Sequence, residues 1–350
     1  VWVRFHWTGT WGYSWFVDDV SIVEMPSDEI ILNYGYFSMG GSEAYGRTPV
    51  SQINDTIILG GEVYNFGSED QSNVTLDATI SNSDNTLISI NTAQSLLESG
   101  SIEFIEDFAA NFTPLEIGNY NINVEVSSDG DNASGENYDN NSYIRSFAIT
   151  DNLYSLDGIG VYDDESLSVS VLGSNSFTGN EDGLIIMNYY EIRETTTVGG
   201  LQAAISNADI YSAGAEIVPF ILSFDAGNTN NVYDRIVEGD YITVTEENLT
   251  EEKIWLPFDQ TVLEPGIYFA CVELYSGAGA NHVGILDDET LNQPSYATQI
   301  YIPSDQTIYT NGTAAAIRLI TDVVMGCTDI IALNYNIDAN TDDGSCSYSS

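Results

Sequence analysis

Positively charged residues are scarce in this sequence. Seven lysines and arginines stand against 53 aspartates and glutamates, the formal net charge is −46, and Lys253 is the only lysine. So acidic a chain repels phosphate backbones and anionic headgroups, which excludes nucleic acid as a partner and disfavours an anionic membrane surface. The self-repulsion becomes tolerable where salt screens it, over a Debye length of about 8 Å at physiological ionic strength. The charge therefore indicates a saline or calcium-containing exterior, although acidity that only keeps the surface soluble explains it equally well.

Catalytic motifs and long apolar runs are missing as well. The two histidines, His6 and His282, are far apart, and neither Gly-x-Ser-x-Gly nor His-Glu-x-x-His occurs. A carboxylate pair for glycoside hydrolysis can always be chosen from 53 acids, so that signal carries no weight. No apolar run approaches the roughly 20 residues of a membrane-spanning helix. We therefore expect a protein that is not an enzyme and does not insert into a membrane.

Cysteine is rare but informative. Two of the three cysteines, Cys327 and Cys346, bracket a short segment rich in Asp and Asn near the C-terminus. Such a segment is too small and too polar to bury a core, so a disulfide, a bound cation or both must hold it. Closing a loop of this size is worth about 3 kcal/mol in the chain-entropy model. We predict a disulfide, and with it a secreted, extracellular or cell-surface location. Cys271 lies in a strand pattern and is predicted to be a buried free thiol.

The same segment suggests calcium. Asp338, Asn340 and Asp342 alternate along the chain, a spacing that can turn several oxygens toward one ion, and Asp343 could complete the shell. Calcium takes about 6–8 oxygen ligands. The glycine of an EF-hand loop comes one residue late and the distal glutamate is missing, so this is not an EF-hand. A disulfide-held polar knot without an ion is the alternative.

Other clusters have a plainer explanation. Three acidic stretches are interpreted as solvated turns, because Asp beside Gly, Ser and Asn is typical of loop tips. They are Asp129 with Asp131 and Glu136, Asp163-Asp164-Glu165, and Asp287-Asp288-Glu289. The aromatic run Trp7, Trp11, Tyr13 and Trp15 could stack on sugars, but core or interface packing is the commoner role of such a strand.

Helical periodicity is nearly absent. Short apolar runs alternate with period two between clusters of Gly, Asn, Asp and Ser, which is typical of β-sandwiches. Four sets are each expected to share one face of a strand: Val74, Leu76, Ala78 and Ile80; Tyr120, Ile122, Val124 and Val126; Val218, Phe220, Leu222 and Phe224; Tyr268, Ala270, Val272 and Leu274. Only Thr92–Glu98 and Leu201–Asn207 could form a turn or two of helix. The sequence predicts an all-β fold.

One corner pattern occurs twice. Leu-x-x-Gly-x-Tyr followed by an alternating strand ends once at Tyr120 and once at Tyr268. A tyrosine there can donate its hydroxyl hydrogen to the backbone across a sandwich corner, whereas a surface tyrosine after a turn is the alternative. Two such corners predict two successive sandwiches.

Three stretches resemble known families. Trp11-Gly-Tyr-Ser-Trp15-Phe-Val-Asp18-Asp19-Val resembles the final strands of the cleaved-adhesin or MAM-like jelly rolls common in secreted Bacteroidetes proteins. Asn54-Asp-Thr-Ile-Ile-Leu-Gly-Gly-Glu-Val-Tyr-Asn-Phe-Gly67, Ser72-Asn-Val-Thr-Leu76, the Gly118-x-Tyr120 strand and Asp139-Asn-Asn-Ser142 are similar to the CARDB-type Ig-like domain. The tail, from Gly326-Cys-Thr-Asp329 to Asp342-Asp-Gly-Ser-Cys346, is similar to short repeats in large surface proteins of the same marine bacteria.

These resemblances imply a division of the chain. Residues 1–27 would be the terminal strands of a preceding jelly-roll domain, and 28–152 an Ig-like β-sandwich. Residues 153–322 resemble the jelly-roll-like sandwiches found beside type IX secretion cargo, and 323–350 would be a small acidic module held by disulfide and calcium. In such jelly rolls an acid at the place of Asp18 or Asp19 often holds a structural calcium, with two solvated turn acids as the alternative.

The functional expectation follows from this organisation. We expect a non-catalytic extracellular structural or adhesive surface protein, a stalk or filament subunit of calcium-stiffened sandwiches, and a processed or partial piece of a longer secreted polypeptide. Its partners would be neighbouring modules or copies of itself, with surface glycans or other cell-surface proteins as targets. The alternative is a set of accessory substrate- or carbohydrate-binding modules of a secreted hydrolase. Binding modules would have an exposed aromatic platform or concave face, and structural modules wide contacts with each other.

Overall fold

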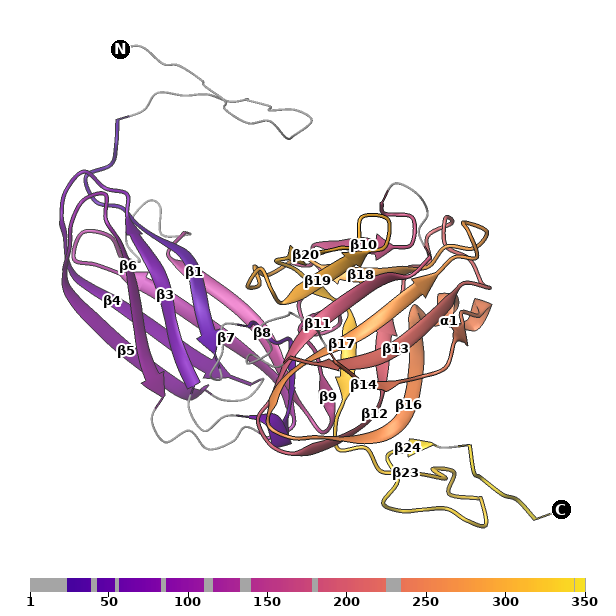
Figure 1. Ribbon diagram of the computed structural model, residues 1–350. Helices are drawn as coiled ribbons and strands as arrows, with labels where there is room; N and C mark the ends of the chain where they lie inside the picture. The colour runs from indigo at the N-terminus through magenta and orange to yellow at the C-terminus, as the bar shows by residue number, and fades with distance from the viewer. Residues whose placement is uncertain are drawn as a thin grey trace.

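The computed structural model describes residues 24–38, 43–53, 57–82, 86–109, 116–132, 140–177, 182–224, 234–342 and 344–349. Strands dominate these residues, so the predicted all-β class is confirmed. Figure 1 shows two sandwiches that follow each other along the chain, with a small module at the C-terminal end. The predicted ligands Asp18, Asp19 and Asp343 and the aromatic run from Trp7 to Trp15 lie outside the described residues.

The first sandwich is built from strands β1 to β8. One sheet has the order β1 (Ile30–Ser38), β3 (Ile57–Asn65) and β6 (Ile102–Ala109). The facing sheet has the order β2 (Arg47–Pro49), β8 (Ser142–Thr150), β7 (Gly118–Ser127), β4 (Gln71–Ser81) and β5 (Thr86–Leu97). A 3-10 turn, Val50–Gln52, follows β2. A sheet of β1, β3 and β6 that faces a sheet of β8, β7 and β4 is the strand arrangement typical of Ig-like sandwiches.

Alternating side chains form the first core. The predicted faces of β4 and β7 are buried between the two sheets, as a period of two requires. At the start of β7 the hydroxyl of Tyr120 donates to the carbonyl oxygen of Glu116 at 2.5 Å. The first predicted tyrosine corner is therefore present.

The second sandwich is larger. One sheet has the order β14 (Asp234–Glu238), β13 (Glu216–Ser223), β17 (Gly266–Tyr275), β11 (Leu184–Ile192), β19 (Thr298–Ile302) and β20 (Thr307–Asn311), with β15 (Ile242–Thr243) also beside β13. Across the core lie β16 (Lys253–Leu263), β12 (Thr196–Ala204), β22 (Ile317–Ile320) and β9 (Leu153–Tyr154), and a further sheet of β10 (Val169–Gly173), β18 (Gly284–Asp288) and β21 (Ala314–Ala315).

The second core fills the space between these sheets. Ala270, Val272 and Leu274 of β17 are buried in it, and the hydroxyl of Tyr268 donates to the carbonyl oxygen of Glu264 at 2.9 Å, which forms the second predicted corner. Strand β13 is buried on both faces, so its predicted residues Phe220 and Leu222 pack in a separate outer cluster with Cys271. Cys271 is the predicted buried free thiol, and burial raises its pKa well above the usual value, so it is unreactive.

Both predicted helical segments are wrong. Thr92–Leu97 belongs to β5, where every residue except Ser95 pairs with β4, and Leu201–Ala204 belongs to β12. Pairing and burial override the helix propensity of their Ala, Gln and Leu residues. Helix α1 (Glu246–Glu251) lies elsewhere, and its first turn carries a capping box between Thr245 and Asn248.

The C-terminal module has little regular structure. Strands β23 (Met325–Gly326) and β24 (Thr341–Asp342) pair in parallel. Among the described residues, no helix is both long and apolar enough to span a membrane.

Candidate functional site

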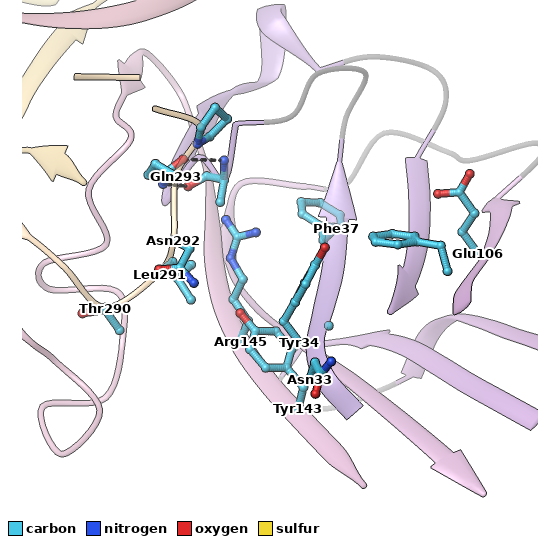
Figure 2. A pocket seen from close by; sticks show the side chains of 14 residues that line it. Asn33, Tyr34, Phe37, Glu106, Tyr143, Arg145, Thr290, Leu291, Asn292 and Gln293 are labelled. Atoms are coloured by element: carbon cyan, nitrogen blue, oxygen red, sulfur yellow. Dashed lines mark hydrogen bonds between the residues drawn. The ribbon is translucent and has the colours of Figure 1, made fainter. Parts of the chain in front are cut away.

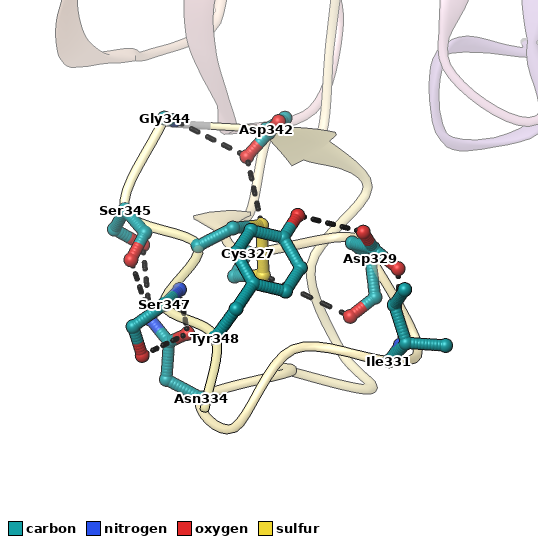
Figure 3. Close-up of a disulfide and its surroundings, with 10 residues drawn as sticks. Cys327, Asp329, Ile331, Asn334, Asp342, Gly344, Ser345, Ser347 and Tyr348 are labelled. Carbon is teal, nitrogen blue, oxygen red and sulfur yellow. Dashed lines mark hydrogen bonds between the residues drawn. A yellow bond between two sulfur atoms is a disulfide. The ribbon is translucent and has the colours of Figure 1, made fainter. Parts of the chain in front are cut away.

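The predicted disulfide is present in the C-terminal module. Cys327 and Cys346 are bonded, with their Cα atoms 4.8 Å apart (Figure 3). Asn334 holds the C-terminal segment of the module against the middle of its loop. Its Nδ2 donates to the Ser345 carbonyl at 2.7 Å, and its Oδ1 accepts from the Ser347 N–H at 2.8 Å. Tyr348 donates its hydroxyl to Asp329 at 2.7 Å. The module is thus a polar knot around one covalent bond.

The proposed calcium residues of this module are not all available as ligands. Asn340 Oδ1 accepts from the Val324 N–H at 2.9 Å, and its Nδ2 donates to the Asp322 carbonyl at 2.7 Å. Asn340 therefore holds the module to the second sandwich. Asp342 accepts from the Gly344 N–H at 3.1 Å, and Asp338 is exposed. The described residues contain no cluster of three or more His, Cys, Asp or Glu side chains suited to a metal. Calcium here stays a prediction.

Several acids interpreted as solvated turns are buried instead. Asp131 accepts from the Ile30 N–H at 2.8 Å and so fixes the start of β1. Asp288 accepts from the Gly158 N–H at 2.7 Å. Asp287 accepts from Thr313 Oγ1 at 2.8 and 2.9 Å. That interpretation is wrong for these three residues, because each meets donors from distant parts of the chain. Asp129, Asp163, Asp164, Glu165 and Glu289 are exposed, and Glu136 lies outside the described residues.

Asp287 makes stability depend on pH. Burial raises its pKa to about 6 from an ordinary 3.8, and the hydrogen bonds from Thr313 and Asn311 offset burial only in part. A raised pKa means that the folded state prefers the protonated acid. Its contribution to stability is complete below about pH 4 and is lost as the pH rises through about 6.

We expect Asp287→Asn to remove this pH dependence. Between pH 4 and pH 7 the wild-type free energy of unfolding should fall by about 2 kcal/mol more than that of the variant. Urea unfolding at several pH values measures the difference. The control is Asp163→Asn, an exposed acid, which should keep the wild-type profile. Parallel profiles for Asp287→Asn and wild type would contradict the assignment.

Backbone hydrogen bonds run from one sandwich to the other without a break. Strand β2 pairs with β8 on one side and with the start of the second sandwich on the other. The Arg47 N–H donates to the Ser155 carbonyl at 3.1 Å, and the Ser155 N–H donates to the Arg47 carbonyl at 3.1 Å. Gly46 is needed here, because a Cβ would lie 2.1 Å from the carbonyl oxygen of Asp157. We call this contact region the joint; it comprises segment 43–53 and the residues of the second sandwich that it touches.

Side chains of the joint enter the second sandwich. Tyr45 is buried in the second core, with its ring 4.5 Å from that of Tyr154, and its hydroxyl accepts from the Glu191 N–H at 3.2 Å. Gln52 Oε1 accepts from the Arg193 N–H at 2.9 Å, and Arg193 Nη1 donates to the Gln52 carbonyl at 2.9 Å. Gln52 Nε2 donates in the other direction, to the Glu194 carbonyl at 3.1 Å, so hydrogen bonds in both directions fix the relative position of the two sandwiches.

A buried ion pair supports the joint. Asp157 is fully buried and accepts from Arg318 Nε at 2.9 Å and Nη2 at 2.7 Å, a bidentate contact. Arg47 Nη1 lies 3.6 Å from Asp157 Oδ1 and donates to Ser155 Oγ at 3.3 Å. The ion pair therefore joins β2 of the first sandwich to β22 of the second.

A cleft of about 720 Å³ opens beside the joint. Its first wall comes from β1, β6 and β8 of the first sandwich, and its second from residues 290–294, between β18 and β19 (Figure 2). Gln293 holds the second wall to the joint. Its Oε1 accepts from the Ala44 N–H at 2.9 Å, and its Nε2 donates to the Ala44 carbonyl at 2.9 Å. Gly35 lets the Tyr143 ring lie on β1, where a Cβ would come within 2.3 Å of it. Sequence reasoning missed this cleft.

Aromatic rings and one arginine line the cleft. Tyr34 and Phe104 meet edge to face with centroids 5.8 Å apart and are 40% and 47% exposed. Arg145 lies deeper, only 5% exposed, with Cζ 5.7 Å from the centroid of the Phe37 ring. The chain thus combines wide contacts between modules with a concave aromatic face.

The one described histidine has a structural setting. His282 Nδ1 lies 3.1 Å from Ser174 Oγ, which is buried and also accepts from the Val283 N–H at 3.4 Å. No acid hydrogen-bonds to His282 among the described residues, so this pair lacks the third member of a catalytic triad.

Comparisons with known proteins identify no family. No protein-family model matches the sequence, and no curated protein matches it. A solved two-domain protein with unknown function from Bacteroides fragilis is similar over 84% of this chain and 94% of that chain, with 9% identity and a TM-score of 0.21. A likeness this weak carries no argument about fold or function.

Proposed function

We propose that this chain belongs to a non-catalytic extracellular surface protein of the modular Bacteroidetes type, in which two coupled sandwiches act as a rigid spacer with an adhesive cleft. The joint is the observation that carries the proposal. Tyr45, Arg47 and Gln52 all bond or pack into the second sandwich. Flexible tethering would need none of these contacts, whereas a stalk that transmits force or holds a fixed spacing needs them.

Charge and sulfur favour the same setting. A disulfide persists in oxidising compartments, which supports an extracellular location. The net charge of −46 suits a saline exterior that screens repulsion between neighbouring modules or copies. Calcium at Asp338, Asp342, Asp343 and one of Asp18 and Asp19 would add stiffness, and it belongs to the proposal on the sequence argument alone.

The cleft favours one competing function. Accessory carbohydrate-binding modules of a secreted hydrolase would also present a concave face with exposed rings such as Tyr34 and Phe104. A surface adhesin and an accessory module would both use the cleft. They differ in whether the same polypeptide also carries a hydrolase domain.

Small-angle scattering tests the rigid spacer. We expect the profile in saline buffer to fit one fixed arrangement of the sandwiches. The double variant Arg47→Ala and Gln52→Ala removes several buried hydrogen bonds of about 1–3 kcal/mol each, so its profile should require an ensemble of orientations. The matched control is Arg235→Ala, an exposed ion pair on β14. A wild-type profile that already requires an ensemble would overturn the proposal.

A further inference from the structure

Arg145 differs from the other arginines of the described residues. Each of the others lies within ion-pair distance of a carboxylate: Arg47 and Arg318 at Asp157, Arg193 at Glu191, and Arg235 at Glu238 and Glu273. No carboxylate of the described residues lies within 4 Å of the Arg145 guanidinium. In a chain with 53 acids, an unpaired arginine is unexpected.

The guanidinium of Arg145 is also short of acceptors. Nη2 donates to the Tyr45 carbonyl at 2.7 Å, and the buried hydroxyl of Tyr162 lies beside the guanidinium, but neither group carries a negative charge. A buried cation without a counter-charge costs free energy that a bound anion would recover. Figure 2 shows the group between the Phe37 ring and the segment that carries Asn292 and Gln293, at the wall of the cleft. The arrangement is suited to an anionic group that enters from the cleft.

The rest of the lining suits a saccharide. Tyr34 and Phe104 offer ring surface at the rim, where the C–H face of a pyranose can pack. Asn33, Asn292 and Glu106 supply amide and carboxylate groups for hydroxyls. The volume of about 720 Å³ falls within the usual range of ligand pockets.

A peptide fits this wall less well. An added peptide strand needs a regular edge for its backbone bonds, and β1 is the strand that borders the cleft. Its register shifts between Leu32 and Tyr34, which interrupts that edge. The lining therefore favours a ligand that is recognised through rings and hydroxyls.

We propose that the cleft binds an acidic saccharide, with a carboxylate or sulfate on Arg145 and a neighbouring sugar ring on Tyr34 and Phe104. This assignment deepens the proposed adhesive function and rests on it. The net charge of −46 repels such a ligand at long range, and salt screens that repulsion more than it screens a contact with a buried guanidinium. Binding should therefore tighten as salt rises, the reverse of ordinary ion pairing.

Calorimetric titration tests the assignment on the whole chain. The probes are trigalacturonate, a sulfated galactose trisaccharide, the neutral galactose trisaccharide, and a tripeptide with a free C-terminal carboxylate. We expect one or both acidic sugars to bind and the neutral sugar and the peptide not to bind. Affinity should rise severalfold between about 50 mM and about 500 mM NaCl. Carboxylate or sulfate preference identifies the anion.

Variants separate the two parts of the site. Arg145→Gln should weaken binding by at least about tenfold, and Arg145→Lys by less. Lys253→Gln removes the same charge from an exposed residue outside the cleft and should change nothing. Phe104→Ala should weaken binding about three- to tenfold. Its control is Tyr309→Ala, a ring with the same 47% exposure on β20.

Several results would overturn the assignment. The first is that Arg145→Gln melts like wild type and still binds the acidic sugars with unchanged affinity. Equal binding of the neutral trisaccharide, peptide binding that depends on Arg145, and no binding of either acidic sugar would also do so. If no acidic saccharide binds, the scattering experiment still tests the rigid spacer independently. The failure of this assignment can therefore be distinguished from the failure of the proposed function.

Discussion

Asp157→Ala should lower the free energy of unfolding of this protein by about 3–5 kcal/mol. The carboxylate is fully buried and receives hydrogen bonds from Arg318, Ser155 Oγ at 2.9 Å and the Ile159 N–H at 3.2 Å. Its removal leaves two buried guanidiniums, those of Arg47 and Arg318, without their counter-charge. An uncompensated buried charge costs far more than the net worth of the pair.

Thermal and urea unfolding measure this effect. Asp157→Asn keeps the shape but not the charge, so it should fall between wild type and Asp157→Ala. The control Asp164→Ala removes an exposed acid close by in the sequence and should stay within about 0.5 kcal/mol of wild type. If Asp157→Ala unfolds at the wild-type denaturant concentration, the ion pair is not what supports the joint.

Local patterns in the sequence were enough to predict the sandwich framework. Alternation placed Leu76 and Val124 in the first core, and the Leu-x-x-Gly-x-Tyr pattern placed both tyrosine corners, since the hydroxyl of Tyr120 reaches only to Glu116. The Cys327–Cys346 disulfide followed from a short polar loop that has no other means of support. Each of these features depends on residues close together in the chain.

Features made by distant residues could not be predicted in this way. Asp287 and Asp288 lie in a stretch with the composition of a loop tip. In the structure Asp287 accepts a hydrogen bond from Thr313, and Asp288 accepts one from the Gly158 N–H. The joint and the cleft likewise depend on how one sandwich lies against the other. One signal was available: Arg145 lies in an alternating strand of a chain with only seven cations, where a buried arginine needs an explanation.

Helix α1 was missed for a different reason. Its signal is local, since Thr245 followed three residues later by Asn248 forms a capping box. The helix spans only six residues, which is too short for apolar periodicity to show. The box uses Asn248 in place of the usual Glu or Gln, so the common capping signature does not reveal the helix either.

Reduction of the Cys327–Cys346 disulfide should unfold the C-terminal module and leave both sandwiches folded. The module buries little apolar surface, and Ile330, Ile331, Leu333 and Ile337 are each more than 70% exposed. The disulfide contributes about 3 kcal/mol by limiting the unfolded loop, so few other interactions remain to hold the module once it is cut. Among the described residues, the second core includes none beyond Leu319, so it does not depend on the module.

Hydrogen exchange read by mass spectrometry measures this directly. After reduction, amides of residues 325–349 should exchange rapidly while those of β11 and β17 stay protected. Cys271 is an internal control, because its buried thiol with a raised pKa should resist alkylation while Cys327 and Cys346 are labelled. Cys327→Ser with Cys346→Ser should reproduce the reduced state without reductant. Asn334→Ala should loosen the module only in part, because the disulfide remains. If residues 325–349 stay protected in the reduced chain, something other than sulfur holds the module, and a bound calcium ion becomes the explanation to pursue with a chelator.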